Sequence, residues 1–172
     1  MDRETLWVIT RRCMFVLVCA IVVLVQTLPL PGSAESWPDP DLIVAIAFAW
    51  TLRRPNLLPP LLVGAVVLVA DLIMMRPPGL WALLVVLGCV YLAYRHKDLS
   101  QVMFGIDWAY AAGTIVAVHV AYYLLQFPLF LPTMGAVPLV LQALFTILSY
   151  PVVVFVSARL FDISKDRKIE DI

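Results

Sequence analysis

Hydrophobic residues along this chain fall into six runs that are separated by short polar or proline-rich connections. The runs cover residues 13–30, 37–52, 57–75, 80–94, 102–126 and 136–158. A helix needs about 20 mostly apolar residues to cross the hydrocarbon core of a bilayer. The pattern therefore predicts an all-α membrane protein, in which residues 1–172 form a single integral membrane domain with six transmembrane helices.

The second run is the weakest of the six. Its strongly apolar part extends only from Leu42 to Leu52, and such a short stretch also suits a re-entrant or protein-buried helix. Re-entry would place Arg53 and Arg54 on the side opposite the other basic residues. We therefore predict a spanning helix that is shielded by its neighbours. Residues 1–12, ahead of the first run, are predicted to form a short amphipathic lead.

Basic residues are sorted by side under this layout. If both termini lie in the cytoplasm, eleven of the twelve Lys and Arg residues lie there as well, and only Arg76 lies outside. Short loops that are rich in Lys and Arg remain in the cytoplasm. The charges therefore predict six crossings with both termini cytoplasmic. The eleven residues are Arg3, Arg11, Arg12, Arg53, Arg54, Arg95, Lys97, Arg159, Lys165, Arg167 and Lys168.

Composition supports the membrane assignment and removes one class of partner. Hydrophobic residues make up 63% of the chain, against about 45–50% in ordinary globular domains. The formal net charge is zero, so the chain lacks the overall basic field that attracts nucleic acid, and we predict no nucleic-acid partner. Indole rings favour the membrane–water interface, and five lie near predicted helix ends, namely Trp7, Trp37, Trp50, Trp81 and Trp108.

The sequence offers little with which to build an enzyme. The chain has two histidines, His96 and His119, and it lacks an HExxH motif, a GxSxG motif and a glycine-rich phosphate loop. We therefore predict no catalytic residue, no metal ligand and no cofactor. His119 lies in the middle of the fifth run, where we expect a neutral side chain that is bonded across a helix interface, with a proton relay as the alternative.

Two carboxylates fall inside the apolar runs, where a charged side chain is costly and usually has a protein partner. Asp71 precedes Arg76 by five residues, so we predict an ion pair that stabilises the Pro-Pro-Gly hairpin, with a contact to a partner or ligand as the alternative. Asp107 is either interfacial or, in an antiparallel packing of the last two runs, in contact with Ser157 or Arg159.

The last two runs carry two stripes that are suited to helix packing. Small residues recur every four positions in the fifth run, and polar residues share one face of the sixth. Small side chains let helix backbones approach closely, and polar ones form interhelical hydrogen bonds. Each stripe serves either packing inside the bundle or the docking of a partner's helix. The small stripe is Ala109, Gly113, Ala117 and Ala121, and the polar one is Gln142, Thr146 and Ser149.

The centre of the chain carries an ordered set of short motifs. They are Arg53-Arg54-Pro55, then Gly64 and Asp71 within one run, then Pro78-Gly79-Leu80 followed by Ala82. In this order, the stretch from Asp41 to Tyr94 resembles the rod shape-determining protein MreD family, as do the chain length and the six-run layout. One departure is that the glycine often found closer to the aspartate is aliphatic here, at Val67 and Leu68.

The resemblance implies a non-enzymatic scaffold subunit of the bacterial cell-elongation complex, in the inner membrane, which supports cell shape and lateral peptidoglycan synthesis. The implied partners are an MreC-like protein, a RodA-type glycosyltransferase, the elongation transpeptidase, MreB and membrane lipid. The implied fold is similar to that of the substrate-binding subunits of ECF transporters. A small-molecule-binding subunit of such a transporter is therefore the alternative function. Candidate structural or partner-contact residues are Arg54, Pro55, Gly64, Asp71, Arg76, Pro78, Gly79, Asp107 and Gly113.

Overall fold

The computed structural model describes residues 3–28, 38–99, 104–128 and 135–161, and the predicted all-α class is confirmed. Six α-helices and one short 3-10 helix make up the described part. They are α1 (Arg3–Thr27), α2 (Leu42–Arg53), η1 (Pro55–Leu57), α3 (Pro60–Ile73), α4 (Leu80–Leu99), α5 (Phe104–Gln126) and α6 (Ala136–Phe161).

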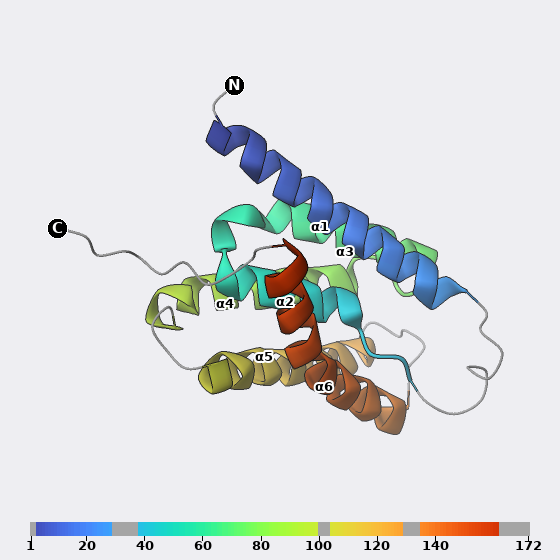
Figure 1. The fold of residues 1–172 in the computed structure, drawn as a ribbon. Helices are drawn as coiled ribbons and strands as arrows, with labels where there is room; N and C mark the ends of the chain where they lie inside the picture. Colours follow the sequence, from blue (N-terminus) through green and yellow to red (C-terminus); the bar gives the residue numbers. More distant parts are fainter. Residues whose placement is uncertain (1–2, 29–37, 100–103, 129–134, 162–172) are drawn as a thin grey trace.

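The helices pack around α2, which lies at the centre of the bundle (Figure 1). α2 contacts α1 on one side, and α4, α5 and α6 on the others. α3 pairs with α4 and also contacts α1, whereas α5 pairs with α6. Two segments that are distant in sequence, α2 and α6, therefore lie side by side.

α2 is buried on all of its faces. Every residue from Ile43 to Leu52 is buried, and its twelve residues give a length of about 18 Å at about 1.5 Å per residue. A hydrocarbon core is about 30 Å thick. The predicted shielding of this helix by its neighbours is confirmed. A helix this short can lie within the hydrocarbon core because its ends contact surrounding helices and not lipid.

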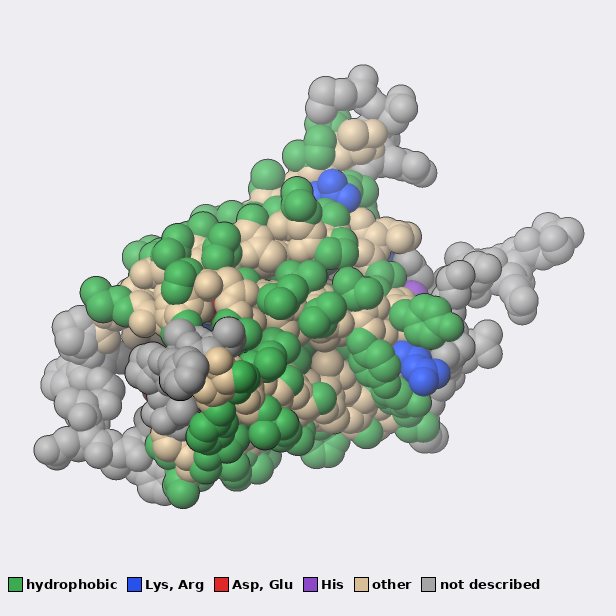
Figure 2. All heavy atoms as spheres, turned by 180° about the vertical axis from the view of Figure 1, so that it is seen from behind, with side chains coloured by type: hydrophobic (Ala, Val, Ile, Leu, Met, Phe, Trp, Pro, Cys, Tyr) green, Lys and Arg blue, Asp and Glu red, His purple; other side chains and the backbone are tan. Residues whose placement is uncertain are grey.

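Three helices are long and apolar enough to cross a membrane, which indicates a membrane protein. They are Thr5–Thr27, Phe104–Gln126 and Ala136–Arg159, and the apolar parts of α2, α3 and α4 are shorter. Figure 2 shows that hydrophobic side chains cover most of one face of the molecule, with Lys and Arg side chains visible in only two places. Such a surface suits contact with lipid.

α1 begins earlier than the hydrophobic pattern predicts. The helix starts at Arg3, so residues 3–12 of the expected amphipathic lead are a continuous part of α1. Two interactions hold the basic turn of α1 against η1, because Arg12 Nε donates to the carbonyl oxygen of Leu57 at 3.1 Å and Arg12 Nη2 donates to that of Asn56 at 3.4 Å. The helix thus includes the charged residues that precede the apolar run.

The end of α3 has the hydrogen bonds of a Schellman motif. The backbone N–H of Arg76 donates to the carbonyl of Asp71 at 2.9 Å, and that of Met75 donates to Leu72 at 3.4 Å. Met75 has a φ of 54° and Gly79 a φ of 90°. The chain therefore reverses through two left-handed residues, of which only Gly79 takes that conformation without steric cost.

Two glycines allow close helix contacts on α4. A Cβ added at Gly64 of α3 would lie 3.2 Å from Val86 Cγ2 of α4. A Cβ added at Gly88 of α4 would lie 2.6 Å from Phe48 Cζ of α2 and 3.1 Å from Thr114 Cγ2 of α5. The absence of a side chain at Gly88 thus sets the distance between α4 and two neighbouring helices.

Candidate functional site

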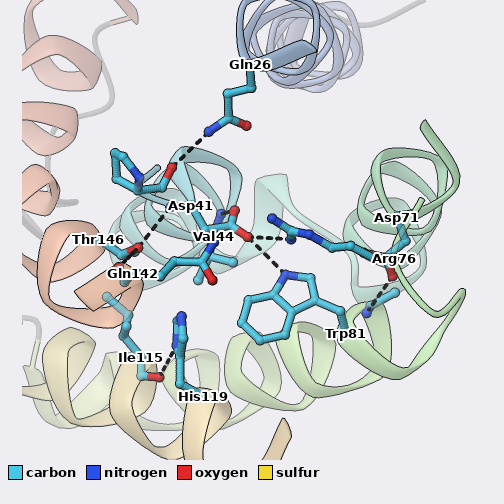
Figure 3. A network of polar contacts seen from close by, with 12 residues as sticks. Gln26, Asp41, Val44, Asp71, Arg76, Trp81, Ile115, His119, Gln142 and Thr146 are labelled. Carbon is cyan, nitrogen blue, oxygen red and sulfur yellow. Dashed lines mark hydrogen bonds and ion pairs between the residues drawn. The ribbon is translucent and has the colours of Figure 1, made fainter. Parts of the chain in front are cut away.

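Asp41 is the centre of a buried polar cluster at the N-terminus of α2 (Figure 3). Only 3% of its surface is exposed. Its Oδ1 accepts a hydrogen bond from the backbone N–H of Val44 at 3.2 Å and so caps the helix. Its Oδ2 accepts from Arg76 Nη1 at 2.9 Å and from Trp81 Nε1 at 3.1 Å. The carboxylate therefore joins α2 to the turn after α3 and to the first turn of α4.

α1 and α6 also bond to this corner of the molecule. The backbone N–H of Asp41 donates to Thr146 Oγ1 of α6 at 2.9 Å, and Gln26 Nε2 of α1 donates to the carbonyl oxygen of Pro40 at 2.8 Å. Thr146 Oγ1 in turn donates to the carbonyl of Gln142 at 2.7 Å. Polar groups from α1, α2, α4 and α6 and from the turn after α3 thus converge at one end of the bundle.

The predicted ion pair between Asp71 and Arg76 is wrong in its acidic partner. Arg76 pairs with Asp41 instead. Asp71, which is buried, accepts a hydrogen bond on Oδ2 from the backbone N–H of Ala82 at 3.2 Å. Both residues still serve the α3–α4 hairpin, because Asp71 bonds to the start of α4 and Arg76 connects the turn to α2. Pro78 and Gly79 lie in the intervening turn.

His119 of α5 lies beside the cluster but bonds within its own helix. Its Nδ1 lies 2.8 Å from the carbonyl oxygen of Ile115, one turn earlier. A carbonyl only accepts, so Nδ1 donates and Nε2 of the neutral ring is an acceptor. Nε2 is buried and has no hydrogen-bond partner among the described residues. The Trp81 ring contacts His119 edge-on, with centroids 5.0 Å apart. The predicted bond across a helix interface is therefore wrong.

The opposite end of the bundle collects the basic residues. Arg54 is the C-cap of α2, and its Cζ lies 5.2 Å from the centroid of the Trp7 ring. Pro55 opens η1, where its fixed φ and missing N–H suit a first helical position. His96 Nδ1 lies 2.6 Å from the carbonyl oxygen of Leu52. Of the arginine side chains in the described segments, Arg76 alone lies at the other end, where it pairs with Asp41.

Asp107 is buried in the first turn of α5, which begins at Phe104, and its interfacial depth stays a prediction. Arg53 and Asp107 both act electrostatically on Tyr150 of α6, which places α5 and α6 against the end of α2. Ser157 accepts a hydrogen bond from Trp50 Nε1 at 3.1 Å. The expected contact of Asp107 with Ser157 or Arg159 stays a prediction.

The two tryptophans of α2 and α4 are core residues. Trp50 and Trp81 are buried, so their rings face protein, and their position at the depth of the membrane–water interface stays a prediction. Trp7 and Trp108 are exposed, at 38% and 37%, and fit that prediction. Trp37 lies outside the described residues, as do Lys165, Arg167 and Lys168.

The small stripe of α5 faces outward. Together with α4 it lines an open groove of about 540 Å³. A Cβ added at Gly113 would meet no atom within 4 Å, so this stripe does not pack inside the described bundle. The polar stripe of α6 does, since Thr146 is buried and bonded to α2. The groove is lined by Leu84, Leu87, Gly88, Tyr91, Ala109, Tyr110, Gly113, Thr114, Ala117, Val118 and Ala121.

Sequence reasoning named Asp41 only as the start of the MreD-like stretch and missed its central position. A local signal was present, because an aspartate directly before an apolar run is a typical N-cap. The capping role follows from that signal. The pairing with Arg76, which is 35 residues away, does not.

In the described segments, no group of three or more His, Cys, Asp or Glu side chains is placed to hold a metal ion. Comparisons of the chain with protein-family models, with curated proteins and with solved structures give no match.

Proposed function

We propose that this chain is a non-enzymatic scaffold subunit of the bacterial cell-elongation machinery, similar to MreD. The proposal rests on the structural role of the MreD-like residues. Gly64, Asp71 and Gly79 form the α3–α4 hairpin, while Arg54 and Pro55 form the corner after α2. These residues bond or pack against the protein's own chain, as expected of a scaffold rather than of a catalyst.

The proposed partners are an MreC-like membrane protein and, with it, the glycosyltransferase, transpeptidase and MreB of the same machinery. Helices associate in lipid through close backbone approach, since apolar burial contributes little there. The groove between α4 and α5 offers such a surface through Gly113 and its small neighbours. We therefore place the partner's transmembrane helix in this groove.

Deletion of the gene is expected to turn rod-shaped cells round, and expression of the wild-type chain to restore the rods. Gly113→Leu should fail to restore them, although the protein is made in normal amounts, because the new Cβ meets no atom within 4 Å and the rest of the side chain extends into the groove. Gly105→Leu is the matched control, since a Cβ at Gly105 of α5 also meets nothing within 4 Å and Gly105 lies outside the groove lining.

Cell shape and co-purification of an MreC-like protein in mild detergent are the two measurements. Equal restoration by Gly113→Leu and wild type would remove the groove as the partner site. Rods that persist after deletion would remove the scaffold function itself.

A proposed topology accompanies this function, with six crossings of the inner membrane and both termini in the cytoplasm. It is supported by the gathering of Arg12, Arg54 and His96 at one end of the bundle and by the positive-inside rule. A reporter that is active only outside the cytoplasm should be active when fused at Ser36 and inactive when fused at Ile172. Activity on the same side at both positions would contradict six crossings.

A small-molecule-binding transport subunit is the second candidate. The observation in its favour is the polar cluster around Asp41 and Arg76, which converges at the end where such a subunit would bind its ligand. It ranks second because the cluster residues are bonded to one another. Tight binding of a vitamin-like molecule by the purified protein, together with normal cell shape after deletion, would favour this candidate.

A further inference from the structure

A pocket of about 320 Å³ lies at the corner between α2 and α3, against one face of α4. Its volume is at the lower end of the range for ligand sites, so it suits a small molecule or one end of a larger one. No charged side chain is among the described residues that line it. Three of the lining residues have no backbone N–H to offer a ligand, namely Pro55, Pro59 and Pro60.

The pocket contains a buried hydroxyl group that is not bonded within its own helix. Thr51 of α2 lines the pocket and is 1% exposed, and its Oγ1 has no partner at hydrogen-bonding distance among the described residues. Thr114 and Thr146 differ, since each donates to the carbonyl oxygen one turn earlier, at 2.8 and 2.7 Å. The Cys89 thiol interacts with the Thr51 hydroxyl, but a thiol is a weak hydrogen-bonding group. A ligand that bonds to this hydroxyl would therefore remove the cost of burying it.

The mouth of the pocket lies between α4 and the first turn of α3. Val90 is 46% exposed and Pro60 is exposed as well, whereas Thr51 and Cys89 are buried. In a membrane protein, an exposed apolar side chain such as Val90 suits contact with lipid. A molecule that is dissolved in the membrane can therefore enter with its polar end first, while its apolar remainder stays next to α4.

We propose that this pocket binds the hydroxyl head of a neutral lipid, a diacylglycerol or a long-chain alcohol, with Thr51 as its hydrogen-bond partner. A hydroxyl both donates and accepts, so the two groups can bond in either direction. Charged headgroups are disfavoured, because a buried charge without a partner is very costly. The pocket shares no lining residue with the α4–α5 groove, so the site is independent of the proposed function.

The test is photolabelling of the full chain in phosphatidylcholine vesicles. The two probes are a medium-chain alcohol that carries a diazirine and the matching alkane, which lacks the hydroxyl. Mass spectrometry of the digested protein should find the alcohol's label on Val90 and Ala93 and on the start of α3. The alkane should label these positions about fivefold less, as expected for the loss of one hydrogen bond. Excess dioctanoylglycerol or farnesol should compete with the alcohol, and the stronger competitor identifies the class of lipid.

Thr51→Val removes the hydroxyl with little change of shape, and it should lower labelling by the alcohol about fivefold. Thr51→Ser keeps the hydroxyl and should retain the labelling. Thr114→Val is the matched control, because Thr114 is also buried but lines the α4–α5 groove and bonds to Tyr110; its labelling should equal that of the wild type. Without ligand, Thr51→Val should be at least as stable as the wild type, because it removes a buried polar group that has no strong partner.

Equal labelling of the pocket by the alcohol and the alkane in the wild type would overturn the site. The same applies if Thr51→Val labels as strongly as the wild type, or if neither hydroxyl lipid competes. A marked loss of stability in Thr51→Val without ligand, or a failure to fold, would show that the hydroxyl is bonded within the protein, and the proposal would then be wrong.

Discussion

Replacement of Asp41 by asparagine is expected to lower the free energy of unfolding in detergent by about 3 kcal/mol, at the lower end of the range for breaking a buried ion pair. Asparagine is as good an N-cap as aspartate, so the bond to Val44 is retained. The carboxylate that receives Arg76 and Trp81 is lost. Asp39→Asn, two residues earlier and exposed, is the control and should change the stability little.

A double-mutant cycle assigns the partner of Arg76. Arg76→Gln combined with Asp41→Asn should cost at least about 1 kcal/mol less than the sum of the single changes, because contacting residues are not additive. Arg76→Gln combined with Asp71→Asn should deviate from additivity by less, because Arg76 acts on the Asp71 side chain electrostatically without an ion pair. A larger coupling of Arg76 with Asp71 than with Asp41 would instead support the ion pair that was predicted from sequence proximity.

Gly88→Leu is expected to prevent folding altogether. Even the Cβ of an alanine at this position would lie 2.6 Å from Phe48 Cζ, and Phe48 is fully buried in the centre of the bundle. Overpacking a tight core costs about 1–3 kcal/mol for small additions, so Gly88→Ala should be less stable and the larger side chain should leave no folded protein. Gel filtration in detergent should show aggregate instead of a single peak.

Two further variants separate this clash from a general loss of glycine. Gly105→Ala adds a methyl group where nothing lies within 4 Å, and it should be neutral or slightly stabilising because alanine favours helix. Phe48→Leu shortens the side chain that the new methyl group meets, so it should restore part of the stability of Gly88→Ala. If Gly88→Ala is as stable as the wild type, α4 is not positioned by this contact.

Hydrophobic patterning predicted the start of a helix well where the helix and the apolar run begin at the same residue. The starts of α4 at Leu80 and α6 at Ala136 are as predicted, because a glycine directly precedes each in the sequence. The start of α1 was placed ten residues late. Arg11 and Arg12 lie directly before the apolar run, yet the helix includes them because Trp7 and η1 provide partners for their side chains.

Pairings were harder to predict than helices. Asp71 and Arg76 are close in sequence, but the turn after α3 brings Arg76 to Asp41 of a helix that is remote in sequence. Likewise, Trp50 and Trp81 lie near helix ends, and only their neighbours decide whether a ring near a helix end faces lipid or protein. The four-residue periodicity also identified the small stripe of α5, but it did not predict that the stripe lines an open groove.

The enclosure of α2 has a consequence for the order in which the chain is made. Two hydrogen bonds hold α2 to α6, from the N–H of Asp41 to Thr146 and from the indole of Trp50 to Ser157. The residues that they join are 105 and 107 positions apart. During translation α2 therefore leaves the ribosome long before its last neighbour exists. Until α6 is inserted, α2 is a short helix with open polar groups, and a chain that stops before α6 exposes it to quality-control proteases.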